Sequence, residues 1–196
     1  MEALVIALIR VAGSLPVLRW AFVGGLIAVF VDLSDLFLRQ AIDLGGLPNY
    51  QEWDKWVDQV YIFLFFYVAM RWSGWERRIA LGLFSWRLIG FVAFLAGAGR
   101  GILIYFPHIF EFWFLYVASR PHWPQWTGRL RGTNPDGSAA PLSGREAAAW
   151  LLVVAALKIF HEYTLHTAKW FDDFTAFEAA EAIWDFISGP FSILLP

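Results

Sequence analysis

Four aspartates form the pattern in this sequence that is best suited to chemistry. Asp32 and Asp35 are three residues apart, and Asp54 and Asp58 are four apart. In a helix either spacing puts both side chains on one face. Carboxylates gathered in one place repel one another unless a cation lies between them, and their oxygens are the ligands that Mg²⁺ and Mn²⁺ prefer. The pattern therefore indicates a divalent-metal site for phosphate chemistry with these four residues as ligands.

Ion pairing without chemistry is the alternative for the same residues. Asp54 follows a helix start expected near Tyr50, where the helix dipole favours an acid. That explanation does not apply to Asp32 and Asp35, because they end an apolar run and lie where the dipole disfavours acids. The basic side chains that could meet their charges are Arg19, Arg39 and Lys55.

The composition is typical of helices that cross a membrane. Of the 196 residues, 59% are hydrophobic and 16% are charged, against about 45–50% and about 25% in soluble domains. Several apolar runs approach the roughly 20 residues that span a bilayer. The net charge of −2 gives no reason to expect nucleic acid as a partner. The absence of cysteine excludes disulfides, thiolate metal sites and cysteine nucleophiles.

We therefore expect an all-α, polytopic transmembrane helix bundle of five to six spans, in the bacterial inner membrane. It forms a single integral membrane domain over residues 1–196. Three parts lie outside the clear spans: a short apolar or interfacial segment at 1–15, an extramembrane loop at 120–145, and an acidic amphipathic tail at 170–196. The clear spans are predicted at about 17–38, 50–70, 76–97, from the glycine-rich turn to 118, and 146–166.

Four capping boxes predict where helices begin, among them two that open with serine. Ser73 and Ser143 are each followed three residues later by a glutamate, Glu76 and Glu146. In such a box the serine side chain accepts from the helix backbone, and the glutamate reaches back to the serine N–H. Each serine is therefore predicted to be the N-cap of a span.

A second group of polar residues lies in the last two spans. His108 and Glu111 share a face of one span, while Lys158, Glu162 and His166 form a stripe on the other. We interpret them as an intrahelical Lys158–Glu162 pair with polar residues near the membrane interface. A metal or proton site is the alternative. The aromatic run from Phe110 to Tyr116 predicts a surface that faces lipid or a partner.

The aspartate pattern resembles the signature of the CDP-alcohol phosphatidyltransferase family. That signature has two aspartates separated by two residues, a glycine, Ala-Arg, a second glycine, and two aspartates separated by three residues. Leu36 and Tyr50 stand where the family has its glycines, while Arg10 ahead of Pro16 resembles its N-terminal segment. The residues that follow the signature's order are Asp32, Asp35, Arg39, Asp54 and Asp58.

This resemblance implies a metal-dependent transferase that moves a phosphatidyl or phosphoalcohol group from a CDP-activated lipid or alcohol. Asp58 would be the catalytic base for the attacking hydroxyl, and Arg39 would bind phosphate. Arg87 would bind the acceptor's phosphate, with interhelical pairing to Glu111 as its alternative. The ligands of Mg²⁺ or Mn²⁺ would be Asp32, Asp35 and Asp54, with Asp58 at the same site.

A different class of function is consistent with the same residues. In a non-catalytic membrane subunit or scaffold, the acids would be ion-paired, and the aromatic faces and acidic tail would bind a partner complex or lipid. A transporter that uses the acids for cation coupling is a third possibility. In either case we expect membrane lipid as a partner and a homodimer or a larger membrane complex.

Overall fold

A computed structural model describes residues 2–41, 50–122 and 140–166, and every regular element among them is helical. The predicted all-α class is confirmed for this part of the chain. The main helices are α1 (Glu2–Ser14), α2 (Ala21–Ala41), α3 (Tyr50–Ala69), α4 (Gly74–Ala93), α5 (Ile109–Ser119) and α7 (Gly144–His166). Short helical turns join them: η1 (Leu15–Leu18), η2 (Phe94–Ala98), η3 (Arg100–Tyr105) and η4 (Arg120–His122). The predicted amphipathic tail at 170–196 lies outside the described residues.

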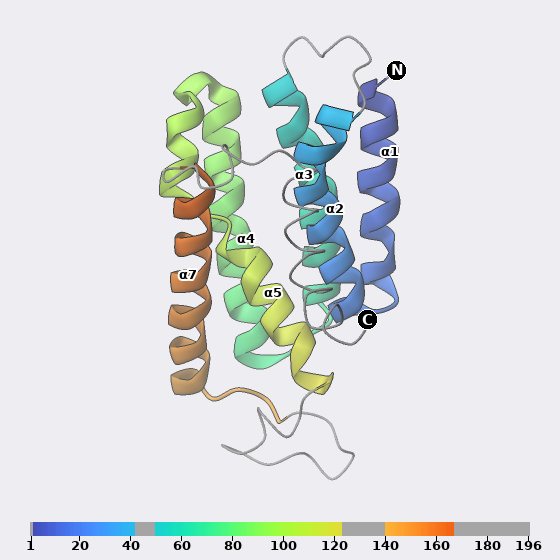
Figure 1. Cartoon of the computed structure of the whole chain (residues 1–196). Coiled ribbons are helices and arrows are strands. Elements are labelled where there is room, and N and C mark those ends of the chain that lie inside the picture. The colour runs from blue at the N-terminus through green and yellow to red at the C-terminus, as the bar shows by residue number, and fades with distance from the viewer. Residues whose placement is uncertain (1, 42–49, 123–139, 167–196) are drawn as a thin grey trace, which may run out of the picture.

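The helices form two neighbouring groups. Helices α1, α2 and α3 pack together on one side of the bundle, and α4, α5 and α7 pack together on the other (Figure 1). The groups meet where α5 contacts α2 and α3, and where α3 contacts α4. Polar side chains from both groups can therefore meet in the interior.

A tight turn sets α1 against α2. Pro16 lies at the start of η1, and its carbonyl accepts a hydrogen bond from the N–H of Trp20 at 2.9 Å. Gly24 then packs directly on the backbone of η1, because a Cβ at this position would lie 2.2 Å from the nitrogen of Val17. This close approach makes α1 and α2 adjacent along their length and turns one face of each toward the other.

The core is built from aromatic rings, and many of them come from α5. Phe110, Trp113 and Phe114 have no exposed surface, and the ring of Phe114 stacks on Phe65 of α3 with 4.1 Å between centroids. The prediction that the run from Phe110 to Tyr116 faces lipid or a partner is therefore wrong for these three residues. They recur at helical spacing on one face, and that face is covered by the neighbouring helices.

The two predicted capping boxes that open with serine have different outcomes. At the start of α7, the Ser143 N–H donates to Glu146 at 2.8 Å, and the Glu146 N–H approaches the Ser143 hydroxyl at 3.4 Å, so this box is confirmed. At the start of α4, Ser73 is the N-cap but makes no side-chain capping bond. Glu76 is 5% exposed and points to other partners, so the box predicted there is wrong.

This difference predicts unequal effects of alanine at the two serines. Ser143→Ala removes a working cap and is expected to cost about 1 kcal/mol of stability. Ser73→Ala removes no capping bond and is expected to change stability by less than about 0.5 kcal/mol, as other surface substitutions do. Thermal unfolding of the two variants in the same detergent would test this. Equal losses would contradict the assignment.

The span predicted to end near residue 118 is divided in two. Helix η3 ends at Tyr105 and α5 begins at Ile109, and the backbone between them leaves helical geometry at Phe106 (φ −121°, ψ 63°). Pro107 lacks an N–H and disfavours helical conformation in the residue before it. The chain is therefore broken in the middle of the bundle, and His108 lies at the break.

Among the described residues, one helical segment, Gly74–Ala98, is long enough and apolar enough to cross a membrane, judged by length and composition alone. It matches the span predicted at 76–97. Shorter apolar stretches cover Leu4–Leu18, Ala21–Ser34 and Trp56–Ala69. The number of spans predicted from the sequence remains a prediction.

Candidate functional site

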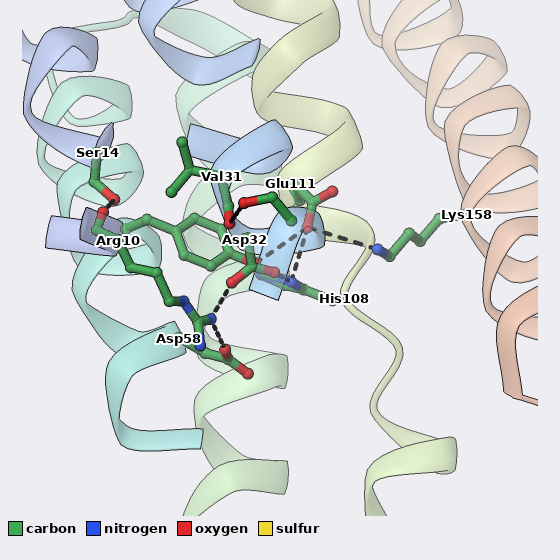
Figure 2. A network of polar contacts seen from close by, with 10 residues as sticks. Arg10, Ser14, Val31, Asp32, Asp58, His108, Glu111 and Lys158 are labelled. Carbon is green, nitrogen blue, oxygen red and sulfur yellow. Dashed lines mark hydrogen bonds and ion pairs between the residues drawn. The ribbon is translucent and has the colours of Figure 1, made fainter. Parts of the chain in front are cut away.

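Arg10 holds two of the four predicted aspartates together. It lies on α1, where it is 4% exposed. One terminal nitrogen of its guanidinium donates to Oδ1 of Asp32 on α2 and to Oδ1 of Asp58 on α3 (Figure 2). The carbonyl of Arg10 accepts a hydrogen bond from Ser14 Oγ at 2.6 Å. The three helices of one half of the bundle thus meet at this side chain.

The positive charge of Arg10 reduces the repulsion between the two carboxylates, Asp32 and Asp58, inside the helix bundle. Two neighbouring carboxylates disfavour each other's charge, and burial disfavours both. A guanidinium is permanently charged and presents several donors, so it can bind both carboxylates at once. Asp58 is 8% exposed, and its charge is acceptable there because this cation accompanies it.

The structure brings together one aspartate from each pair, since Asp32 and Asp58 share one partner. That partner is Arg10, which was not among the basic residues predicted to meet these charges. The available signal was its place as the one charged residue within the apolar segment 3–12. The side chains of three further predicted site residues lie outside the described part of the structure: Asp35, Arg39 and Asp54.

The predicted metal site is only partly covered by the described residues. Among these, no group of three or more acidic or histidine side chains is arranged to hold a metal ion. Asp32 and Asp58 are the described members, and both are bound by Arg10. As described, these two carboxylates do not make a complete ligand set, so the site for Mg²⁺ or Mn²⁺ remains a prediction.

A second cluster centres on one oxygen of Glu111. The hydroxyl of Tyr61 donates to Oε2 of this residue at 3.2 Å. Nδ1 of His108 lies 3.2 Å from the same oxygen, and Nζ of Lys158 lies 3.6 Å from it. Apart from Tyr61 of α3, these residues come from the helix break, α5 and α7 (Figure 2). All four side chains are buried.

Sequence analysis found most of this cluster but not its connections. His108 and Glu111 do share a face, as predicted, whereas Lys158 contacts Glu111 on the neighbouring helix. The predicted Lys158–Glu162 pair and His166 involve side chains outside the described residues. Tyr61 was missed, although it follows Asp58 by three residues and so lies on the same face of α3.

Arg87 stabilises the broken helix. Its Nη1 donates to the carbonyl of Phe106 at 2.9 Å, a group that the break has removed from regular helical bonding. The alternative predicted for Arg87, an ion pair with Glu111, is replaced by this bond to the backbone. Its role toward an acceptor phosphate remains a prediction.

A third buried ion pair was also missed. Glu76 Oε1 accepts from Arg120 at 2.7 Å and from the backbone N–H of Leu142 at 2.8 Å, and a second guanidinium nitrogen of Arg120 donates to the Ala140 carbonyl. Glu76 was predicted to be part of a capping box, so its pairing with Arg120 was not anticipated. The pair joins the start of α4 to the end of α5 and to the segment that leads into α7.

Taken together, the interior has two ionic clusters that Tyr61 brings close to each other. One contains Arg10 with two carboxylates, and the other contains Glu111 with three donors or donor-capable groups. Such an arrangement can hold helices in register, bind a cation or exchange a proton. No protein-family model, curated protein or solved structure matches the chain.

Proposed function

We propose that the chain is an integral membrane protein that crosses the bacterial inner membrane five or six times. The distribution of side chains supports this. Large apolar residues are exposed on α1, α2, α3, α4 and α7; for example, Phe30 and Leu152 are each 73% exposed. Charged residues including Arg10, Glu111 and Lys158 are buried. Large exposed apolar surfaces mark contacts with a membrane or a partner, and the buried charged residues here are paired with one another.

Helix length also supports several spans. Helices α2 and α3 have 21 and 20 residues, which corresponds to about 30 Å of helix, the thickness of the hydrocarbon layer. Within them, the apolar stretches Ala21–Ser34 and Trp56–Ala69 each contain one aspartate, Asp32 and Asp58. Those charges face the bundle interior and bind Arg10, as ionisable residues in membrane helices usually do.

The geometry best supports a non-catalytic membrane subunit or scaffold within that membrane. The observation that carries this proposal is the shared pairing of Asp32 and Asp58 with Arg10, because it gives both acids a role in joining helices. The exposed apolar residues of α7, among them Leu152 and Leu157, are available to lipid, to a second copy or to a larger membrane complex.

A metal-dependent transferase is the second candidate, and one observation favours it. Asp32 and Asp58 come from separate aspartate pairs and converge, as a shared metal site requires. Asp32, Asp35 and Asp54 would then hold Mg²⁺ or Mn²⁺, which would neutralise the pyrophosphate of a CDP-activated substrate. Asp58 would take the proton of the attacking hydroxyl, and it would first have to leave Arg10 because Arg10 now binds its Oδ1.

One assay separates the two candidates. Purified chain in lipid nanodiscs is incubated with a CDP-activated lipid and an alcohol acceptor, with Mg²⁺ or Mn²⁺ present, and CMP release is measured. The subunit proposal expects no release above the protein-free background. Metal-dependent release that falls about 10²-fold or more in Asp58→Asn, the loss expected for a catalytic base, would favour the transferase. Glu146→Gln, in the cap of α7, is the control that should leave such release unchanged.

A subunit role also predicts how the protein behaves on purification. Mild detergent extraction from the native membrane is expected to yield a species larger than one chain with its detergent, measured by light scattering. A lone monomer under those conditions would count against the subunit proposal, whatever the CMP assay gives.

A further inference from the structure

Three atoms at the centre of the second cluster lie in mutual contact. Tyr61 Oη is 3.2 Å from Glu111 Oε2 and 3.3 Å from His108 Nδ1. The third side of the triangle, from His108 Nδ1 to Glu111 Oε2, is 3.2 Å. The hydroxyl of Tyr61 supplies one proton and can direct it along one side only.

The contact between His108 Nδ1 and Glu111 Oε2 therefore needs a second proton, in addition to that of the Tyr61 hydroxyl. Without one, a nitrogen lone pair and a carboxylate lone pair would face each other at 3.2 Å, inside a buried site where unpaired polar groups are costly. With one proton, either Nδ1–H donates to the carboxylate or a protonated Glu111 donates to Nδ1. The contact accommodates the proton on either atom.

The helix break provides a second and independent observation at this place. His108 lies between η3 and α5 and has non-helical backbone angles (φ −81°, ψ 53°). Within a membrane, broken backbone occurs where it faces protein or a polar cavity, and broken helices often carry binding sites near the middle of the bilayer. The break ends regular helical bonding between η3 and the first turn of α5, which carries Glu111.

We propose that Glu111 and His108 form a proton-binding centre that controls the contact between α5 and α7. At neutral pH, Glu111 is a carboxylate that binds Tyr61, His108 and Lys158. A proton that enters from water forms an O–H bond on Glu111 and removes its negative charge. Lys158 keeps its positive charge, loses its counter-ion, and α7 moves away from α5. This centre acts in the same way whether the protein is a subunit or an enzyme.

The other charged and titratable groups around the centre come from every neighbouring helix. Arg87 of α4 binds the carbonyl of Phe106, two residues before His108. His161 lies on α7, with its ring against Phe112 of α5. Helices α1, α2 and α3 contribute the first cluster, which Tyr61 adjoins. The members of that cluster are Arg10, Asp32 and Asp58.

The test measures protonation and helix separation in the same protein. Full-length chain in lipid nanodiscs is examined by infrared difference spectroscopy between neutral and acidic pH. The sequence has no cysteine, so introduced cysteines carry the spin labels at chosen sites. We place them at Ser119→Cys, at the end of α5, and Leu152→Cys, on α7. Wild type is expected to gain a carboxylic-acid C=O band at acidic pH and to lengthen the distance between labels.

The variants assign both signals. Glu111→Gln should gain a weaker carboxylic-acid band than wild type, the difference being the contribution of Glu111. It should show the long distance at every pH, because glutamine carries no charge for Lys158 to bind. Lys158→Met should also show the long distance throughout, and Lys158→Arg should restore the pH response. Glu146→Gln, in the cap of α7, should behave as wild type.

Two outcomes would overturn the proposal. One is a carboxylic-acid band of the same intensity in Glu111→Gln as in wild type, and the other is a distance that does not change with pH in wild type. If Glu111→Gln does not fold, Tyr61→Phe gives the decisive measurement, since it removes one hydrogen bond and preserves the ring. It should move the protonation midpoint to higher pH because the carboxylate loses a donor, and an unchanged midpoint would also overturn the proposal.

Discussion

Replacement of Arg10 with methionine is expected to destabilise the protein by about 3–5 kcal/mol, the usual cost of removing one partner from a buried ion pair. Methionine fills much of the same space, so the loss comes mainly from charge. Asp32 and Asp58 would remain close together without the guanidinium that binds both. Thermal unfolding in nanodiscs, with tryptophan fluorescence as the probe, measures the change.

The matched control and the rescue make this prediction specific. Arg19→Gln removes an arginine that is exposed at the end of η1, and it should change stability by less than about 0.5 kcal/mol. In the triple variant with Asp32→Asn and Asp58→Asn, the uncompensated charges are gone, so most of the loss should be recovered. A triple variant as unstable as Arg10→Met would show that packing, not charge, explains the effect.

Replacement of Arg120 with methionine is the second change with a large expected effect. Glu76 would keep its bond from the Leu142 N–H but lose its only described cation, at a site where both side chains are less than one-tenth exposed. We expect a loss of about 3–5 kcal/mol for the same reason. The carbonyl of Ala140 would also lose the donor that Arg120 supplies.

Two measurements test this prediction. Thermal unfolding gives the overall loss, and hydrogen exchange at the Leu142 amide reports whether the segment before α7 has loosened. Arg77→Gln is the control, because Arg77 adjoins Glu76 in sequence but is exposed, and it should leave both readouts near wild type. Normal protection of Leu142 in Arg120→Met would mean that the ion pair does not anchor this segment.

The sequence predicted helices well because helix formation depends on local patterns. The start of α3 at Tyr50 and the start of α7 after Ser143 were both placed correctly, since caps and apolar runs act over a few residues. Ser73 and Glu76 show the limit of this reasoning. The same spacing that makes a box at Ser143 places Glu76 beside Arg120, and a buried cation is a stronger partner than an N-terminal N–H.

Partners that are distant in sequence could be anticipated only in part. That Asp32 and Asp58 would approach each other followed from a short connection between two helices. The identity of their cation did not follow, because Arg10 reaches them through the packing of α1 on α2 and α3. Tyr61 and Lys158 were likewise joined to Glu111 by the arrangement of three helices, which helical spacing within a single segment cannot predict.

The position of Arg10 early in the chain has a consequence for biosynthesis. In the membrane protein that we propose, α1 leaves the ribosome before α2 and α3, so Arg10 has neither aspartate to bind when it reaches the membrane. An unpaired arginine at the centre of a membrane helix costs about 2.5–3.5 kcal/mol on insertion scales, and α1 has only 13 residues to offset it. We therefore expect α1 to wait at the membrane surface and to enter the bilayer together with α2 and α3, which makes insertion of the first three helices a single cooperative event.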